Sequence, residues 1–205
     1  MNKSTSVYID PLPGSESPER RKRNGQATKE AILEAGLRAF SEHGYDGVGL
    51  REIAKAAGVT AVLINRYYGT KEDLFSAAVD AAFGGDHPFS GDVTTLASRL
   101  AKLLVAKTHD STDGPDGLLL LLRSAANPRA AEILKTAIER SFATPLRSGL
   151  EGESVDLRVA LFLAQIAGFQ LMSQVILLDA LSKAGSRKLS TLLTRMFEHL
   201  LLPGD

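Results

Sequence analysis

The 205-residue sequence has no cysteine and no tryptophan, and its net charge is zero. Without cysteine the chain has no disulfides, no thiol chemistry and no cysteine-bound zinc, which suits a reducing compartment such as the cytoplasm. The balance of 24 basic against 24 acidic residues argues against a protein that binds nucleic acid over its whole surface. A composition of 44% hydrophobic and 23% charged residues is ordinary for a soluble protein.

Motifs of catalysis and of metal binding are also missing. The histidines, which are His43, His87, His109 and His199, have no metal-ligand spacing with one another. There is no glycine-rich phosphate loop after a strand and no serine elbow. The sequence therefore predicts no cofactor, no metal site and no enzymatic activity, and an enzyme is kept only as a competing class.

A long uninterrupted apolar run is absent as well. The segment from Leu157 to Leu178 is the most hydrophobic, but polar side chains interrupt it, namely Arg158, Gln165, Gln170, Ser173 and Gln174. Such interruptions are costly in lipid, so no membrane span is expected. A buried or subunit-facing helix is the better interpretation.

Helical spacing recurs along the chain, whereas no segment alternates with period two for long. Helices are expected at about residues 28–43, 50–57, 61–68, 71–83, 93–109, 117–126, 128–150, 155–181 and 186–201. Turn residues such as Asn127-Pro128 and Ala184-Gly185 separate them. We therefore predict an all-α protein.

The stretch from Gly58 to Leu74 is the most informative part of the chain. The helix before it stops at Gly58, because glycine suits the left-handed position after a helix. Thr60 can offer its hydroxyl as N-cap to the next helix. The connection then has about three residues, which is the length found in helix-turn-helix units.

The helix that follows has two faces. Val59, Ile64 and Tyr68 fall on one side, which we expect to pack inward. The residues that turn outward are Ala61, Val62, Asn65 and Arg66, with Leu63 beside them. An apolar outward face suits contact with thymine methyl groups, and Arg66 can pair with guanine O6 and N7. This face is a candidate DNA-reading surface.

An earlier helix, with Ile32, Gly36 and Phe40 at every fourth position, completes a three-helix unit. Taken together, the motifs resemble the TetR-type transcriptional regulators from about Thr28 to Phe75. The segments that carry the resemblance are Ala31 to Ala35 with Phe40, His43 to Val48, Ile53 to Val59 and Tyr67 to Phe75.

The resemblance implies a homodimer with an N-terminal helix-turn-helix DNA-binding domain, placed at residues 24–75. A larger helical domain for effector binding and dimerisation follows at residues 76–205. The predicted base-reading residues are Ala61, Val62, Leu63 and Arg66. The predicted phosphate contacts are Thr60, Asn65, Tyr67, Lys71, Lys29 and Arg51. For Tyr67 and Lys71 the alternatives are a core ring and a solvated charge.

Two positions depart from the family pattern. Asn65 stands where the family commonly has tyrosine, and Gly49 stands where it often has threonine. Glycine is a weaker helix cap than threonine, although an acceptable one. Asparagine keeps a hydrogen-bond donor but reaches less far, so the phosphate contact at Asn65 is the departure that matters most.

The first 23 residues are expected to be a disordered tail with a basic end. Residues 1–19 contain prolines and serines and no apolar run, so they form neither a signal peptide nor a helix. The cluster Arg20-Arg21-Lys22-Arg23 follows. It either reaches into a minor groove or remains a solvated tail that adds nonspecific attraction.

The last two predicted helices, near 155–181 and 186–201, are candidates for dimerisation. Such helices can pair with their copies across a two-fold axis as a four-helix bundle. Two recognition helices would then read double-stranded DNA about one turn apart, roughly 34–36 Å, so the operator should be an inverted repeat. A helical protein-interaction module without DNA binding is the remaining alternative.

A small-molecule effector site is expected among the helices from Val93 to Leu178, whose side chains are mostly aliphatic. Its candidate residues are His109, Arg123, Ser124, Asn127, Phe142, Phe162, Gln165, Phe169, Gln170 and Gln174. An aliphatic lining predicts a hydrophobic or amphiphilic effector. For Arg123 the alternative is pairing with an acidic residue, and for the other polar residues it is a helix cap, a dimer contact or a solvent-facing position.

Overall fold

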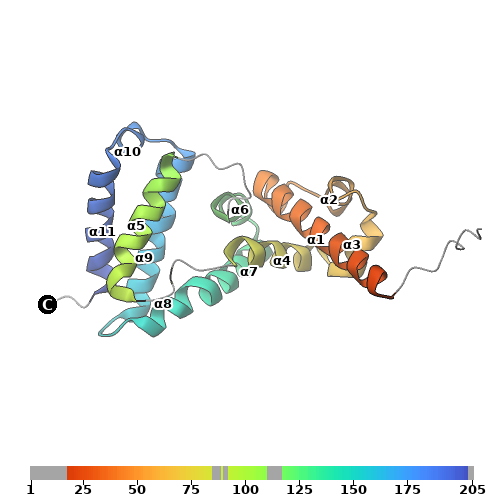
Figure 1. Ribbon diagram of the computed structural model, residues 1–205, viewed down its shortest axis with the longest axis horizontal. Helices are drawn as coiled ribbons and strands as arrows, with labels where there is room; N and C mark the ends of the chain where they lie inside the picture. The colour runs from red at the N-terminus through yellow and green to blue at the C-terminus, as the bar shows by residue number, and fades with distance from the viewer. Residues whose placement is uncertain (1–17, 85–88, 90–91, 110–116, 203–205) are drawn as a thin grey trace, which may run out of the picture.

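The computed structural model describes residues 18–84, 89, 92–109 and 117–202, and every regular element in those ranges is a helix. The predicted all-α fold is confirmed. The helices form an elongated molecule in which a head, made of the first four helices, is separated from a body by α6 and α7 (Figure 1).

The head consists of α1 (Pro18–His43), α2 (Leu50–Ala56), α3 (Ala61–Tyr68) and α4 (Lys71–Phe83). Its core contains the fully buried Ile32, Phe40 and Phe75. The rings of Phe40 and Phe75 meet edge to face with centroids 5.1 Å apart, a favourable aromatic geometry. The fourfold spacing of apolar residues on α1 thus places them in one core.

The first helix begins earlier than predicted. It starts at Pro18 rather than near Thr28, so residues 18–23, assigned to the disordered tail, are helical. Proline is tolerated in the first turn of a helix, because the amide it lacks has no partner there. The rest of the predicted tail, residues 1–17, lies outside the described residues.

The body contains α5 (Val93–His109), α8 (Thr144–Gly149), α9 (Val155–Gln170), α10 (Asp179–Ser182) and α11 (Ser186–Leu201). A second core lies between α5, α9 and α11, where the rings of Phe162 and Phe197 are 5.0 Å apart. The predicted helix 155–181 is interrupted: α9 continues as a π-helical turn, η2 (Leu171–Val175), and then stops. Leu177 has a φ of 57°, a left-handed conformation that ends the helix.

Two helices join the head to the body. They are α6 (Gly117–Ser124) and α7 (Pro128–Ile138), and α7 continues through the π-helical turn η1 (Glu139–Ala143) into α8. Leu120, Ala130 and Leu134 of these helices belong to the same buried cluster as the core of the head. The packing therefore crosses the predicted domain boundary between residues 75 and 76, which itself remains a prediction.

One arginine fastens the end of α11 to the start of α9. The Arg158 guanidinium donates to the carbonyl oxygens of Leu200 at 2.8 Å, Leu201 at 3.1 Å and Glu151 at 2.8 Å. The last carbonyls of a helix have no partner within the helix, and a cation there also opposes the negative end of the helix dipole. Arg158, which the sequence suggested only as an interruption of an apolar segment, is a helix-end cap.

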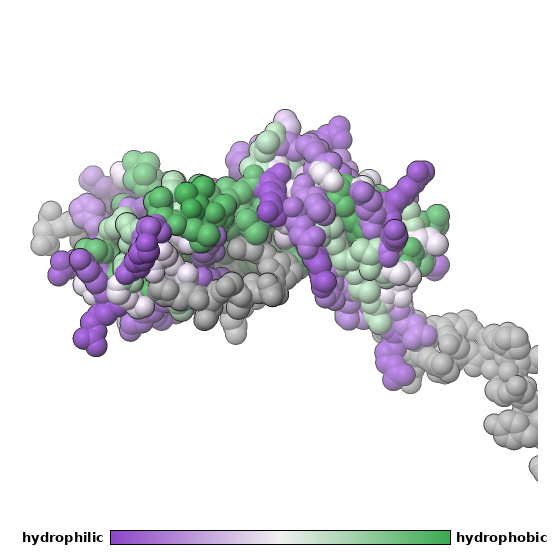
Figure 2. All heavy atoms as spheres, turned by 90° about the horizontal axis from the view of Figure 1, so that it is seen from above, coloured by the Kyte–Doolittle hydropathy of each residue, from purple (hydrophilic) through white to green (hydrophobic). Residues whose placement is uncertain are grey.

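The outer face of α9 remains apolar and open. Leu157 and Leu161 are exposed on α9, and the apolar surface continues through Met172 of η2 to Ile176 just after it. Figure 2 shows hydrophobic side chains gathered on the body. The helix Val155–Val175 is long and apolar enough to cross a membrane, by length and composition alone. Polar groups also lie along it: Gln165, Ser173 and Gln174 each have a buried side-chain atom without a hydrogen-bond partner.

Candidate functional site

The connection between α2 and α3 has the predicted left-handed glycine. Gly58 has a φ of 67°, and the Val59 amide donates to the Ala54 carbonyl at 2.9 Å. Thr60 occupies the N-cap position of α3 with extended backbone, but its hydroxyl makes no capping hydrogen bond. At the start of α2, the Gly49 amide donates to Glu52 Oε2 at 2.7 Å, so Glu52 partly compensates for the missing threonine.

The two faces of α3 are arranged as predicted for Ile64, which is fully buried, and for Val62, which is 75% exposed. Asn65 and Arg66 are exposed on the outer side, whereas Ala61 and Leu63 are half-buried. Tyr68 is half-buried rather than part of the closed core, and its hydroxyl donates to the Lys29 carbonyl at 2.8 Å. The outward face therefore combines one exposed valine with an amide and a guanidinium.

The predicted phosphate contacts differ in how exposed their side chains are. Arg51 and Lys29 are exposed, and Lys29 Nζ lies 5.7 Å from the centroid of the Tyr68 ring. Lys71 Nζ lies 4.5 Å from the Tyr45 ring centroid, so Lys71 is held by a cation–π contact and is more than a solvated charge. Tyr67 is half-buried and packs against the core of the head.

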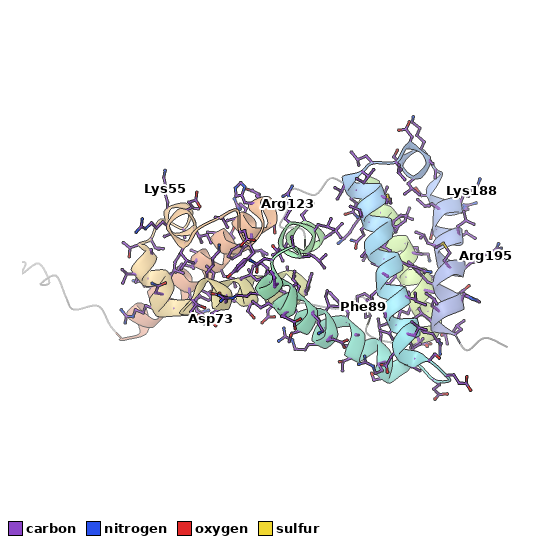
Figure 3. The ribbon with its side chains drawn as sticks, turned by 180° about the vertical axis from the view of Figure 1, so that it is seen from behind. Lys55, Asp73, Phe89, Arg123, Lys188 and Arg195 are labelled. Carbon is purple, nitrogen blue, oxygen red and sulfur yellow. The ribbon has the colours of Figure 1, made fainter. Side chains whose placement is uncertain are left out.

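The corner between α3 and α4 is fixed by a capping box that the sequence analysis did not identify. The Asp73 amide donates to Thr70 Oγ1 at 3.1 Å, and the Thr70 amide donates to Asp73 Oδ2 at 2.9 Å. Hydrogen bonds from the Thr70 hydroxyl and amide lower the pKa of Asp73. Figure 3 shows Asp73 at this end of α4. A threonine followed three residues later by a carboxylate is the sequence signal for such a box.

The head touches α6 and α7 through several polar contacts. The Tyr45 amide donates to the buried Ser124 hydroxyl at 3.0 Å, and Arg123 donates to the Ser41 carbonyl at the end of α1 (Figure 3). Asn127 Nδ2 donates to Asp46 Oδ1 at 2.9 Å. Arg123 therefore pairs with a backbone carbonyl, and neither of its predicted partners, an effector anion or an acidic residue, is the one observed.

A second set of contacts links α7 and the η1 turn that follows it to α4. Arg129 Nη1 lies 2.9 Å from Glu72 Oε1, and Arg140 pairs with Asp80. The backbone amide of Glu72 lowers the pKa of its own carboxyl group, and Arg129 lowers it further. Burial raises the pKa of Tyr45, and the neighbouring Glu72 carboxylate adds to this. These contacts connect the start and the middle of α4 to the body side of the molecule.

The end of α4 reaches a hydrophobic cavity of about 290 Å³ between the head and the body. It is lined by Ala82, Phe83, Gly84, Phe89, Leu100, Leu103, Leu104, Lys107, Gly117, Leu118, Leu121, Ile138, Phe142, Leu163, Ile166, Ala167 and Gln170. The volume is near the lower end of the range for small-molecule pockets, about 300–1,000 Å³. This cavity is the candidate effector site.

Only some of the predicted effector residues lie around the cavity. Phe142 and Gln170 do, whereas Phe162 is buried in the body core, and Gln165 and Phe169 do not line the cavity. Asn127 is the N-cap of α7, because its Oδ1 accepts from the Arg129 and Ala130 amides. His109 ends α5, but its side chain lies outside the described residues.

Lys107 lines the cavity and was not predicted. Its signal is helical spacing: Leu100, Leu103, Leu104 and Lys107 occupy one side of α5 at intervals of three and four. Within the described ranges, no group of three or more His, Asp or Glu side chains is placed to hold a metal ion.

Comparison with known proteins covers most of the chain. Residues 32–78 match the model of the "Bacterial regulatory proteins, tetR family", and residues 95–201 match that of the "Tetracyclin repressor-like, C-terminal domain". The HTH-type transcriptional regulator AcrR of Shigella flexneri is 46% identical over 57 residues, which are 28% of this chain and 26% of that protein. The HTH-type regulatory protein RaaS of Mycobacterium tuberculosis is 48% identical over 59 residues, 28% of this chain and 27% of that protein.

The matched segment thus spans about a quarter of the curated relatives' own length. Solved structures extend the likeness of fold. A TetR-family regulator from Streptomyces coelicolor A3 has a TM-score of 0.54 at 22% identity, covering 93% of this chain and 100% of that one. The multidrug binding protein EbrR, solved with proflavin, has a TM-score of 0.56 at 20% identity, covering 82% and 99%.

The named relatives are regulators rather than enzymes. The second family model alone covers more than half of the chain, from residue 95 to residue 201 of 205. The helix-turn-helix geometry of α2 and α3 agrees with the first model. The chain belongs to the TetR family of bacterial regulatory proteins.

Proposed function

We propose that this protein is a homodimeric repressor that binds an inverted-repeat operator and is released by a small hydrophobic or amphiphilic effector. The observation that carries the proposal is α3 itself, a short helix that buries Ile64 and turns Val62, Asn65 and Arg66 outward. A helix presented in this way after a tight turn fits the major groove. No catalytic or membrane role is part of the proposal, and the protein would act in the cytoplasm.

Readout of the operator would divide between bases and backbone. Arg66 would donate to guanine O6 and N7, and Ala61, Val62 and Leu63 would contact thymine methyl groups. The hydroxyl of Thr60 would contact a phosphate, and it is available because it does not cap α3. Further phosphate contacts would come from Asn65, Tyr67, Lys71, Lys29 and Arg51, and Arg23 at the basic start of α1 would add attraction.

Dimerisation would use the open apolar face of α9 together with α11. Leu157 and Leu161 of α9, Met172 of η2, and Leu192 and Met196 of α11 are exposed. Monomeric proteins rarely leave a contiguous apolar patch of this kind in water. A second copy of the chain would cover the patch and could supply partners for Gln165 and Gln174.

Release would work through α4. This helix of 13 residues begins at Lys71, beside the proposed DNA surface, and ends at Phe83 in the cavity. An effector that fits the cavity only when Phe83 has moved would shift the other end of α4. The spacing between the two heads of the dimer would then change. Coupling free energies of about 1–3 kcal/mol are typical of such two-site systems.

Selection of bound sequences from a random DNA pool tests the proposal. We expect an inverted repeat with half-sites about one helical turn apart. Arg66→Ala should lose about 1–3 kcal/mol of discrimination at one base pair in each half-site. Lys102→Ala is the matched control, because it removes one exposed positive charge from α5, in the body and outside the proposed dimer face. Failure to enrich any sequence, or an Arg66→Ala profile equal to that of the parent, contradicts the proposal.

A further inference from the structure

Among the described residues that line the cavity between α4, α5 and α9, Lys107 is the only charged one, and we propose that this cavity selects an anionic amphiphile, a carboxylate on a hydrophobic body. This inference rests on the proposed function, since it names the chemical class of the effector. Lys107 and Gln170 are also the only polar side chains in that described part of the lining, where the other residues are glycine, alanine, leucine, isoleucine or phenylalanine. No acidic residue is among the described residues that line it.

The two polar side chains lie at the same end of the cavity. Helices α5 and α9 run in the same direction through the body (Figure 1). Lys107 follows the lining residue Leu100 on α5, and Gln170 follows Leu163 on α9, each by seven positions. At 1.5 Å per residue both polar groups lie roughly 10 Å further along than their apolar counterparts.

The opposite end is aromatic. The Phe142 ring lies 5.2 Å from that of Phe83 and 5.1 Å from that of Phe89, centroid to centroid. Phe89 also meets Phe162, which precedes Gln170 by eight positions on α9. Figure 3 shows Phe89 beside the helix that runs from α7 into α8. The cavity therefore changes along its length from an aromatic wall to a polar end, as an amphiphile does.

The polar end of the cavity carries a positive charge. Lys107 makes no hydrogen bond or ion pair with any other residue that the structure describes. Its ammonium has three donors and no acceptor, so a carboxylate satisfies it and an amine does not. Gln170 can donate to the same carboxylate from its amide nitrogen. A cationic effector would meet the like charge of Lys107, and none of the described lining residues is a carboxylate.

Calorimetric titration of the full-length protein with decanoate, methyl decanoate and decylamine tests the sign of the charge. The three compounds share one hydrocarbon chain and differ in the head group. We expect decanoate to bind about tenfold tighter than the ester, because hydrogen bonds to charged groups are the strong ones. Decylamine should bind more weakly than the ester.

The lysine is tested by two matched variants. Lys107→Met should reduce decanoate affinity to that of the ester and leave ester affinity unchanged, since methionine keeps the apolar stem. Lys102→Met is the control, because Lys102 is exposed on the same helix and does not line the cavity. It should change neither affinity. Thermal unfolding without ligand checks that both variants are folded.

Several results would overturn the inference: equal affinity for acid and ester, tighter binding of the amine, or an unchanged preference for decanoate in Lys107→Met. If the ligand-free parent protein does not bind DNA, the proposed function fails instead. The ligand titrations contain no DNA, so they test the inference separately. Conversely, an ester that binds as tightly as the acid and releases the operator leaves the proposed function standing and removes the anionic class.

Discussion

The head and the body treat their hydrophobic surfaces differently. Among the described residues of α1 to α4, Val62 is the only large hydrophobic side chain that is exposed, and it lies on the outward face of α3. The body exposes many, including Leu157, Leu161 and Ile176. Three of the four buried side-chain atoms that lack a hydrogen-bond partner in the described residues also lie on α9 and η2.

This difference teaches what each region needs. The head closes its core with helices of the same chain, so its outward residues are free to contact DNA. The body leaves apolar area exposed to solvent and leaves buried side-chain amides without hydrogen-bond partners. Buried polar groups without partners are costly. A second copy of the chain would remove both deficits, which supports the proposal that dimerisation and DNA binding use different parts of the fold.

The largest effect is expected where the two regions touch. Gly44 has a φ of 73°, and a Cβ atom there would lie 2.3 Å from the Arg123 carbonyl oxygen. In Gly44→Ala, left-handed strain of about 1–2 kcal/mol adds to a packing cost of about 1–3 kcal/mol. Urea denaturation measures the loss of unfolding free energy.

Gly58→Ala is the matched control for that substitution. Gly58 is also left-handed, with a φ of 67°, but a Cβ atom there meets nothing within 4 Å. Only the strain of about 1–2 kcal/mol should remain. If both variants lost the same unfolding free energy, α6 would be able to move away from the added methyl group at Gly44. The contact between α6 and the head would then be less rigid than its hydrogen bonds indicate.

An intermediate effect is expected inside the body. Arg158→Ala removes three hydrogen bonds to carbonyl oxygens of Leu200, Leu201 and Glu151 and should cost about 1–3 kcal/mol. Arg195→Ala on the exposed side of α11 should stay within about 0.5 kcal/mol. Hydrogen exchange should rise at the end of α11 in the first variant only. If hydrogen exchange at the end of α11 were equal in both variants, the Arg158 hydrogen bonds would not be what holds α11 to α9.

The smallest effect is expected at the surface link between α7 and α4. A double-mutant cycle of Glu72→Ala and Arg129→Ala should give a small coupling that weakens with salt, because Arg129 is 78% exposed. The pKa of Glu72 is lowered, so its stabilisation is present above the ordinary value of 4.5 and is lost as the pH falls through the folded pKa. Cycles repeated from neutral to acid pH check this sign. A coupling that grows with acid would contradict it.

The helices and the inward face of α3 could be predicted because their signals are local. Apolar spacing marks Ile32, Phe40 and Ile64, and glycine marks the turn at Gly58. The junction could not be predicted in this way: the contacts of Arg123 with Ser41 and of Asn127 with Asp46 join residues about 80 positions apart. No period or cap motif encodes such a pairing.

The effector residues show the same limit. Polar residues within apolar helices were the predicted candidates, and Gln170 does line the cavity. Arg123 and Asn127 have equally polar side chains, but tertiary packing turns them toward the head instead. Lys107 carries a helical-spacing signal, yet that signal alone does not distinguish a cavity wall from a solvated face.

The sharing of α6 and α7 with the core of the head has a consequence for synthesis. Leu120, Ala130, Leu134 and Ala137 complete the hydrophobic cluster that begins with Ile32. During translation the first four helices therefore emerge before the residues that cover them. Their hydrophobic cluster would be complete only when about residue 138 has left the ribosome. Domains usually fold as units from the N-terminus. The DNA-binding end of the nascent chain would therefore complete its core only after the middle of the protein has been made.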